Sequence, residues 1–371
     1  MVKQKKESLV APIRYRALRL FMFRERKFFV ILILFFLAAF AFAPFPQIAM
    51  WLGFCFAGYA AIANDSIQTI GTFLASNAKR PWWILWLFVT GIFVAVMTYS
   101  WVVYQGDVSF QRLATPEFAQ APQEFKFLQL AAPIVLLLLT RFRMPVSTTF
   151  LCLSAYSTES SGIFSMLEKS ANGYFIAFAS AFLLWFFLSK SISKLTKGKA
   201  HPIWDVFQWL VSGILWAVWL MQDLANIAVT LPRSLGLVEF LAFIGYISIG
   251  MGILFYMRGD KIQDIITKKS ETKDVRAATL IDLVYSAILI VFLAISPVPM
   301  STTWVFLGLL GGRELAIAVS RHYAVKKKTT QAVRLIVNDV SNAFIGLIIS
   351  VLIAIIVNPE IQKEFRSFFN G

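Results

Sequence analysis

Residues 82–104 read WWILWLFVTGIFVAVMTYSWVVY, a run of 23 residues without a charged side chain. A helix of roughly 20 apolar residues crosses the hydrocarbon core of a bilayer, so this run predicts a transmembrane helix. Two further apolar stretches, 145–156 and 299–319, open with a proline and hydroxyl residues, which predicts broken or short helices. The remaining apolar runs are 28–43, 48–63, 127–139, 173–188, 203–221, 237–257, 277–295 and 337–357. The sequence therefore predicts an all-α polytopic membrane protein with about eleven transmembrane elements.

Composition and charge support the same class. Of 371 residues, 58% are hydrophobic and only 15% are charged, whereas soluble domains carry roughly 25% charged residues. The net charge of +15 would indicate nucleic-acid binding in a soluble protein, but here the basic residues gather between the apolar runs. Their clusters are 1–27, 79–80, 141–143, 190–199, 258–276 and 321–334. The positive-inside rule then predicts a multi-pass inner (plasma) membrane protein with a cytoplasmic N-terminus, an external loop at 105–126, and contact with lipid and not with nucleic acid.

Cysteine and histidine usage disfavours several kinds of chemistry. Cys55 and Cys152 lie in apolar runs, and His201 and His322 lie beside basic loop residues. These positions disfavour a disulfide framework, a histidine metal site and a serine–histidine triad. We therefore expect that the protein is not an enzyme, has no catalytic residue and binds no metal or cofactor. The small residues at 41–43 leave a cleaved signal peptide as an alternative for the first span, but the long basic region before it favours a retained anchor.

Two polar motifs each occur twice, in the same order. The first, ANDSIQ at 63–68, is echoed by MQDLAN at 221–226. The second, PVSTT at 145–149, is echoed by PMSTT at 299–303. The acids of the first pair are 158 residues apart and the first serines of the second pair are 154 apart, so the sequence predicts a duplicated unit.

The predicted direction of the two units is opposite. The span with the first acid should run from outside to inside, whereas the span with the second acid starts at a cytoplasmic loop and runs outward. Inverted repeats with discontinuous helices are typical of secondary transporters, whose substrate lies near the midplane. We therefore expect a cytoplasmic basic tail and first membrane anchor at 1–46, transport repeat 1 at 47–200, an inverted transport repeat 2 at 201–357 and a short C-terminal tail at 358–371.

The two acids lie in otherwise apolar runs, with carboxamides beside them. An aspartate at the bilayer centre costs at least a few kcal/mol and needs a partner. Carboxylate and carboxamide oxygens are hard ligands suited to Na⁺, and the acids also suit a proton relay. The alternative is that these groups bond one another at a helix contact, but their recurrence favours an ion site. The candidate residues for cation binding or coupling are Asn64, Asp65, Gln68, Gln222, Asp223 and Asn226.

The hydroxyl motifs predict a site for the opposite charge. Proline is tolerated in the first helical turn, so the amides that follow it face the helix mouth together with the hydroxyls, where they attract an oxyanion. The alternative is an ordinary N-cap by Ser147 or Ser301, but duplication of the motif favours convergence on one anion. The candidate substrate-binding residues are Ser147, Thr148, Thr149, Ser301, Thr302 and Thr303.

Taken in order, these motifs resemble those of the inorganic phosphate transporter (PiT) family across roughly residues 47–357. Halves of that family usually carry Gly-Ala-Asn-Asp-x-x-Asn-Ala and Pro-x-Ser-Thr-Thr-His. The resemblance implies cation-coupled phosphate uptake, with relatives that carry sulfate. This chain departs from the pattern at Gln68, Phe150 and Trp304, and the family's further membrane acid falls on Gln129 and near Asp282.

Residues 338–343, NDVSNA, also resemble the acid motif but open the last apolar run, so we interpret them as a helix entry capped by Asp339. Two pairs of opposite charges lie close together in the sequence, Arg233 with Glu239 and Arg313 with Glu314. We interpret both as surface or interface pairs.

The sequence thus favours a secondary active transporter of a small inorganic oxyanion. We expect phosphate as the substrate, Na⁺ or H⁺ as the coupling ion, and a homo-oligomer as a further assembly. Two alternatives stay open, namely a sulfate permease of the same family and a non-transporting membrane sensor or assembly protein.

Overall fold

The computed structural model describes residues 25–142, 144, 146–195, 198–257, 274–320 and 325–370. Every regular element within these ranges is helical, which confirms the predicted all-α class. Pro145, most of the basic N-terminal tail, and much of the basic segments 258–276 and 321–334 lie outside the described residues.

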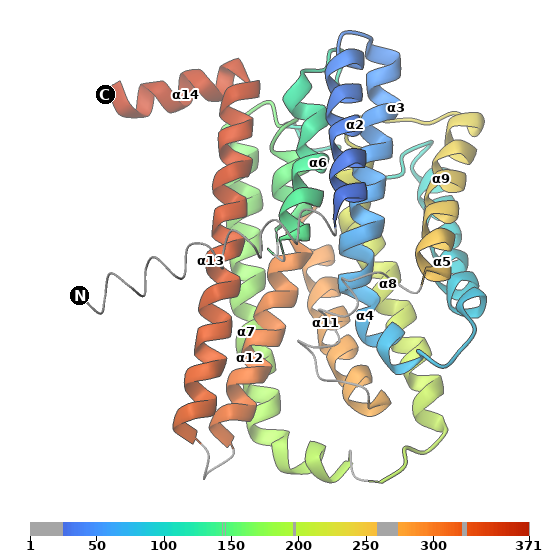
Figure 1. The fold of residues 1–371 in the computed structure, drawn as a ribbon, viewed down its shortest axis with the longest axis vertical. Helices are drawn as coiled ribbons and strands as arrows, with labels where there is room; N and C mark the ends of the chain where they lie inside the picture. The colour runs from blue at the N-terminus through green and yellow to red at the C-terminus, as the bar shows by residue number, and fades with distance from the viewer. Residues whose placement is uncertain are drawn as a thin grey trace.

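The helices form an elongated bundle (Figure 1). The first half comprises α2 (Arg26–Phe42), α3 (Pro46–Ala60), the π-helix η1 (Ala61–Ser66), α4 (Ile67–Ser76), α5 (Trp82–Val103), α6 (Phe127–Arg141), the π-helix η2 (Thr149–Leu153) and α7 (Ser160–Leu195). The second half comprises α8 (Ile203–Ala228), α9 (Leu237–Tyr256), α11 (Val275–Ile295), α12 (Thr302–Ser320), α13 (Val325–Val357) and α14 (Pro359–Asn370).

Eight helices in the described part are long and apolar enough to cross a membrane, so the chain is a multi-pass membrane protein. They are Pro46–Ser66, Trp82–Val103, Ser160–Leu188, Ile203–Ala228, Leu237–Tyr256, Val275–Ile295, Thr302–Ser320 and Thr329–Val357. Two of the expected spans, α2 and α6, have only 17 and 15 residues and are therefore shorter than these eight helices. The two proline-led stretches also differ from each other, because the first contains only the short η2 whereas the second contains the continuous α12.

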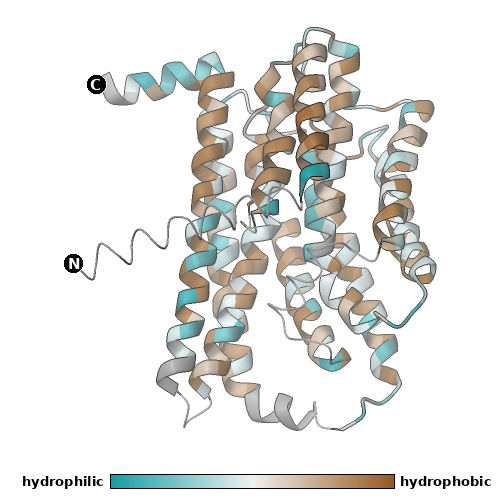
Figure 2. Ribbon diagram, viewed as in Figure 1, coloured by the Kyte–Doolittle hydropathy of each residue, from teal (hydrophilic) through white to brown (hydrophobic). Residues whose placement is uncertain are grey.

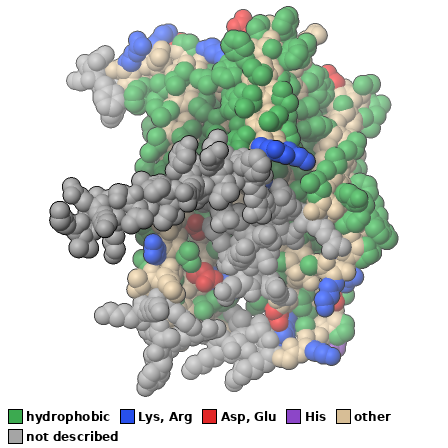
Figure 3. Space-filling model, viewed as in Figure 1, with side chains coloured by type: hydrophobic (Ala, Val, Ile, Leu, Met, Phe, Trp, Pro, Cys, Tyr) green, Lys and Arg blue, Asp and Glu red, His purple; other side chains and the backbone are tan. Residues whose placement is uncertain are grey.

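The outer face of the bundle is apolar over most of its height (Figure 2). The side chains of Phe187 and Val238 are 73% and 80% exposed, and both lie on helices that are long and apolar enough to cross a membrane. Apolar side chains also cover most of the upper part of the face drawn in Figure 3. Such a surface is unfavourable in water and matches contact with lipid.

The acid-bearing segments lie side by side and run in opposite directions. Near one end, the side chain of Asn77, just after α4, is hydrogen-bonded to Gln208 in the first turns of α8. Near the other end, a Cβ on Gly53 of α3 would lie 2.8 Å from Cγ2 of Thr230, just after α8. In Figure 1, α3 leads down into α4 while α8 rises beside them. The opposite direction expected for this pair is therefore present, and the inverted relation of the complete halves stays a prediction.

Helices α7 and α12 make the closest helix pair. A Cβ added to Gly308 would overlap with the carbonyl oxygen of Tyr174, and one added to Gly312 would overlap with that of Phe178. The two glycines are four residues apart on one face of α12, the spacing that lets membrane helices approach through their backbones. This contact fixes the position of α12, which begins at the second hydroxyl motif.

The last helices differ from the sequence-based interpretation. Asp339 was expected to cap a helix, but it lies inside α13, which begins fourteen residues earlier at Val325. After α13 the chain turns sharply into α14, which lies across the end of the bundle (Figure 1). Within α14, Ile361 is buried and Lys363 points outward, so the helix is amphipathic.

Candidate functional site

The first acid motif lies in the π-helix η1, between α3 and α4. Asp65 is buried, and its Oδ1 accepts a hydrogen bond of 2.6 Å from Nδ2 of Asn64. Two hydroxyls bond to backbone carbonyls in the same region, Ser66 to Ile62 at 2.5 Å and Thr69 to Asp65 at 2.9 Å. A π-helical turn interrupts the regular ladder of an α-helix and is frequent at functional sites. The interruption coincides here with the predicted acid.

The second acid motif lies within the regular helix α8. Oδ1 of Asp223 accepts a hydrogen bond of 2.8 Å from Nδ2 of Asn226, one turn later. The neighbouring Gln222 points elsewhere and donates to the carbonyl of Leu289 on α11 at 3.3 Å. The two acid motifs therefore have different backbones, and the carboxamide that bonds the carboxylate precedes it in the first motif and follows it in the second.

The two serines of the hydroxyl motifs make the capping contacts that the sequence analysis left as an alternative. Oγ of Ser147 accepts from the amide of Phe150, and Oγ of Ser301 accepts from the amide of Trp304, both at 3.2 Å. A serine hydroxyl that accepts one hydrogen bond can still donate its own hydrogen. The equal geometry at the two motifs agrees with their common sequence.

The hydroxyl motif of each half contacts the acid motif of the other half. Oγ1 of Thr149 lies 3.3 Å from Oδ1 of Asp223 and 3.2 Å from Nδ2 of Asn226. In the reciprocal contact, Oγ1 of Thr303 donates to Oε1 of Gln68 at 3.4 Å. Segments up to 235 residues apart in the sequence thus meet. Hydrogen bonds join Asn64 to Asp65, Thr149 to Asp223 and Asn226, and Thr303 to Gln68, whereas Gln222 bonds to α11. We use the name cradle for the full set of twelve candidate residues, Asn64, Asp65, Gln68, Ser147, Thr148, Thr149, Gln222, Asp223, Asn226, Ser301, Thr302 and Thr303.

Several buried oxygens of the cradle have no hydrogen-bond partner among the described residues. They are Oδ2 of Asp65, Oγ1 of Thr148, Oε1 of Gln222, Oδ2 of Asp223 and Oδ1 of Asn226. Buried polar atoms are normally satisfied, so a group of unsatisfied oxygens calls for a ligand. Oxygen-rich sites of this kind suit hard cations. Among the described residues no cluster of three or more histidine, cysteine, aspartate or glutamate side chains is present, so the ligand set would draw on amides and hydroxyls as well.

Other residues hold the second hydroxyl motif in place, and the sequence analysis did not identify them. The indole nitrogen of Trp219 donates to Oγ1 of Thr302 at 3.2 Å, and the hydroxyl of Tyr285 donates to the carbonyl of Thr302 at 3.0 Å. The amide of Ser301 donates to Oγ of Ser170 at 2.8 Å. Their signal in the sequence is weak because tryptophan, tyrosine and serine are all common in membrane helices.

A third buried acid, Asp282, lies on α11. Its carboxylate accepts from the hydroxyls of Thr72 at 2.5 Å and Ser212 at 2.6 Å. These contacts join α4, α8 and α11. The corresponding Gln129 in the first half has a different role, since it accepts from the amide of Lys126 and donates to the carbonyl of Ala155.

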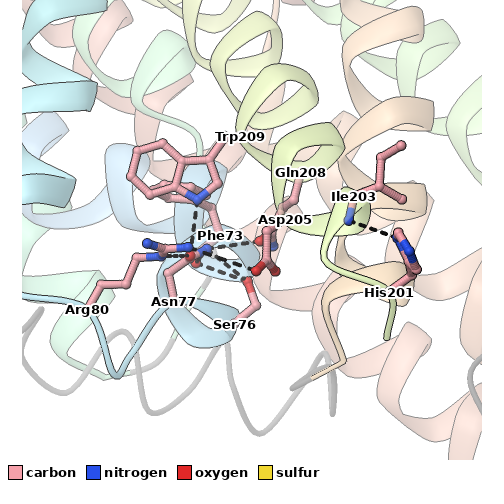
Figure 4. Close-up of polar contacts among 9 residues, drawn as sticks. All are labelled: Phe73, Ser76, Asn77, Arg80, His201, Ile203, Asp205, Gln208 and Trp209. Carbon is pink, nitrogen blue, oxygen red and sulfur yellow. Dashed lines mark hydrogen bonds and ion pairs between the residues drawn. The ribbon is translucent and has the colours of Figure 1, made fainter. Parts of the chain in front are cut away.

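At one end of the bundle, side chains of α4 and α8 interlock (Figure 4). Nδ2 of Asn77 donates to Oε1 of Gln208 at 2.9 Å, and Gln208 donates in turn to the hydroxyl of Ser76. The indole nitrogen of Trp209 donates to Oδ1 of Asn77 at 3.2 Å, and the guanidinium of Arg80 lies over the same indole ring. We call these side chains the clasp. They hold α4 against α8 at the end opposite the loop 104–126.

Comparisons with known proteins were made for the whole chain. No protein family matches it, and no curated protein matches it. Among solved structures, the chain is similar to one described as "The sodium-dependent phosphate transporter". The similarity has a TM-score of 0.45 at 18% sequence identity, and it covers 82% of this chain and 98% of the other.

Proposed function

We propose that the chain is a secondary active transporter of a small inorganic oxyanion, with phosphate as the first candidate substrate. The observation that carries the proposal is the reciprocal contact in the cradle, where Thr149 meets Asp223 and Thr303 meets Gln68. A site formed between two halves of a bundle changes when the halves move, which is what alternating access requires.

The chemistry of the cradle supports transport of an anion together with a cation. The hydroxyls of the two motifs can donate hydrogen bonds to an oxyanion. The carboxylates of Asp65 and Asp223 would repel that anion unless a cation or proton neutralises them. Their unpartnered Oδ2 atoms are available for this cation. We therefore propose that Na⁺ or H⁺ binds at the acid motifs and makes the anion site favourable.

A second candidate function follows from the aromatic residues that succeed the hydroxyl motifs. The rings of Phe150 and Trp304 make an edge contact with centroids 5.4 Å apart, so the two motifs meet through apolar groups beside their hydroxyls. This contact favours a protein that binds an oxyanion without moving it, as a sensor or assembly protein would. Sulfate remains the alternative substrate because it has the same tetrahedral shape.

The organisation of the chain belongs to the same proposal. We place transport repeat 1 at 47–200 and the inverted transport repeat 2 at 201–357, with a basic tail and anchor before them and a short tail after them. The basic residues near the clasp, such as Lys79 and Arg80, support a cytoplasmic location for that end. We further propose the inner (plasma) membrane as the location, with a cytoplasmic N-terminus.

Uptake of labelled phosphate into proteoliposomes tests the proposal. We expect uptake that depends on an imposed Na⁺ or pH gradient, each imposed separately, and that sulfate inhibits if it shares the site. Asp65→Asn and Asp223→Asn should abolish the dependence on the cation, whereas Glu360→Gln on the exposed face of α14 should not. Binding of phosphate without uptake would reject transport in favour of the sensor, and unchanged coupling in both aspartate variants would reject the cation role.

The anion role of the helix starts needs its own variants. Ser147→Ala combined with Ser301→Ala should raise the phosphate concentration for half-maximal uptake. An unchanged concentration together with a lower melting temperature would show that the serines act as helix caps alone.

A further inference from the structure

Two buried basic side chains meet outside the cradle. Arg112, in the loop after α5, is 2% exposed, and Lys169 on α7 is 8% exposed. Both donate to the carbonyl of Ser296, Arg112 at 2.5 Å and Lys169 at 2.8 Å. Lys169 also donates to the carbonyl of Val298. The segment that leads to the second hydroxyl motif is therefore held by two basic side chains.

Neither cation forms an ion pair with a described residue, and Nε of Arg112 is buried without a hydrogen-bond partner. Other buried basic groups of the chain do have acidic partners, as Arg276 has in Asp274 and Arg313 in Glu314. Burial lowers the pKa of Arg112 to about 10 while the negative charge of Asp223 opposes this change, so the guanidinium stays charged at neutral pH. A buried charge without a direct ion pair is costly, so an anion bound beside Arg112 would stabilise it.

Arg112 lies in the wall of a cavity of about 730 Å³ at the loop end of the bundle. The cavity reaches the segment 293–297 on one side and Met221, next to Gln222 of the cradle, on another. Its other lining residues are mostly apolar or aromatic, among them Tyr99 and Phe110. A concave, mostly apolar site with one or two charged groups is the usual form of a small-ligand site.

We propose that this cavity is a second anion site, in which Arg112 binds a small tetrahedral oxyanion such as inorganic phosphate or sulfate and Lys169 adds to the positive field. Nη1 and Nη2 of Arg112 each donate one hydrogen bond, to the carbonyls of Ser296 and Leu293, while Nε has no partner among the described residues. A guanidinium has five N–H donors, so the donors that remain can bind oxygens of such an anion. The site lies between the loop end and the cradle, so it would collect the anion before the anion reaches the hydroxyl motifs. That use in transport rests on the proposed function, whereas binding at Arg112 does not.

A purely structural role for Arg112 is the competing explanation, and Arg233 provides the matched control. Arg233 lies at the same end, burial also lowers its pKa to about 10, and it donates to the carbonyls of Phe118, Gln120, Val229 and Leu231. It does not line the cavity. Loss of either arginine removes ties between a loop and the bundle, but only loss of Arg112 should remove anion binding.

The test is equilibrium binding of labelled phosphate and sulfate to the full chain in lipid-free detergent, in the Ser147→Ala, Ser301→Ala background. We expect Arg112→Gln to weaken binding by about tenfold or more, because a charge-assisted hydrogen bond is lost. Arg112→Lys should weaken it by only a few-fold, and Arg233→Gln should leave it unchanged. Unchanged binding in Arg112→Gln, or an equal loss in Arg233→Gln, would overturn the proposal.

A second measurement covers the case in which Arg112→Gln does not fold. Tyr99→Cys places a thiol in the cavity wall, and bound phosphate should slow the labelling of this thiol by a charged thiol reagent. Labelling of the wild type measures the contribution of Cys55 and Cys152, which is subtracted. Labelling at the same rate with and without phosphate would overturn the proposal.

A lipid headgroup offers the same phosphate chemistry, so nanodiscs distinguish the two sources. Binding of phosphate should be equal in nanodiscs of neutral lipid and of phosphatidylglycerol. Displacement by phosphatidylglycerol would assign the cavity to lipid and overturn the free-anion site. Absence of phosphate uptake together with Arg112-dependent binding would leave this inference standing while the proposed transport fails.

Discussion

Replacement of Thr149 by valine tests the contact between the two halves most directly. The hydroxyl of Thr149 lies within hydrogen-bond distance of Oδ1 of Asp223, of Nδ2 of Asn226 and of the carbonyl of Met300, at 3.3, 3.2 and 3.1 Å. Valine keeps the shape and volume of threonine but can neither donate nor accept. The change therefore removes the polar tie between η2 and α8 without opening a cavity.

The expected size of the effect follows from these contacts. A hydrogen bond to a charged group contributes about 1.5 to 3 kcal/mol and a neutral one about 0.5 to 1.5 kcal/mol. Part of this is retained, because Asn226 still donates to Asp223 at 2.8 Å. We therefore expect a net loss of about 1 to 2 kcal/mol, which corresponds to a roughly 5- to 30-fold rise in the half-saturating concentration of the coupling cation.

Phosphate uptake into proteoliposomes, measured against Na⁺ at fixed pH and against pH at fixed Na⁺, gives this concentration. Thr149→Ser restores the hydroxyl and should behave like the wild type. Thr303→Val removes a longer contact, 3.4 Å to Gln68, and should have a smaller effect. Equal activity of Thr149→Val and wild type, or equal defects in Thr149→Val and Thr149→Ser, would refute the role of the hydroxyl.

Three further predictions concern the framework of the site. Gly312→Ala should lower the thermal stability of the purified protein although alanine favours helices, because its methyl group would overlap with the carbonyl of Phe178; an unchanged melting temperature would contradict this. Hydrogen bonds from Arg276 lower the pKa of Asp274 below its ordinary 3.8, so the stability from this contact is present above that pH and is lost as pH falls further. Melting temperatures below about pH 4 should therefore fall more steeply in wild type than in Asp274→Asn, and parallel curves would refute the contact. Asn77→Ala should open the clasp. A cysteine placed in the cradle should then react faster with a thiol reagent added from the clasp side, and at an unchanged rate with the same reagent added from the loop end.

The sequence predicted which segments contain the repeated polar motifs but not the backbone form that these segments take, and the role of their residues stays a prediction. Repetition of the two polar motifs identified the segments that meet at Thr149 and Asp223, because a polar group in a membrane helix needs a partner from another helix. It did not predict that Asp65 lies in a π-helix whereas Asp223 lies in a regular one. The π-helix η1 packs against α9, where Ile62 lies beside Gly250, and no local pattern encodes such a tertiary contact.

The charged residues outside the motifs were predicted less well. Arg313 does pair with Glu314, but Arg233 bonds to backbone carbonyls and Glu239 caps its own helix at the amide of Gly236. Carbonyl acceptors occur at every residue, so the sequence gives no sign of which ones a basic side chain will use. Arg112 falls within the loop 105–126 that the sequence predicts to be external, and nothing near it in the sequence indicates that it is buried. Lys169 directly follows Glu168 in α7, so its neighbour in the sequence suggested an ordinary charged turn and gave no signal for the basic pair.

The two ends of the bundle differ in a way that bears on the proposed transport cycle. At the clasp, α4 and α8 are joined by the side-chain bonds of Asn77 with Gln208, Gln208 with Ser76, and Trp209 with Asn77. At the loop end, a cavity reaches Met221 of the same α8. Separating α4 from α8 would break these bonds at a cost of about 2 to 5 kcal/mol. A ligand shifts such an equilibrium only by its difference in affinity for the two states, and roughly 5.5 kcal/mol moves it from 1:99 to 99:1. Under the proposed mechanism the anion and the cation together must supply that difference. Because Asp223 lies on α8, two residues after Met221 in the cavity wall, their binding acts on the helix that would have to move.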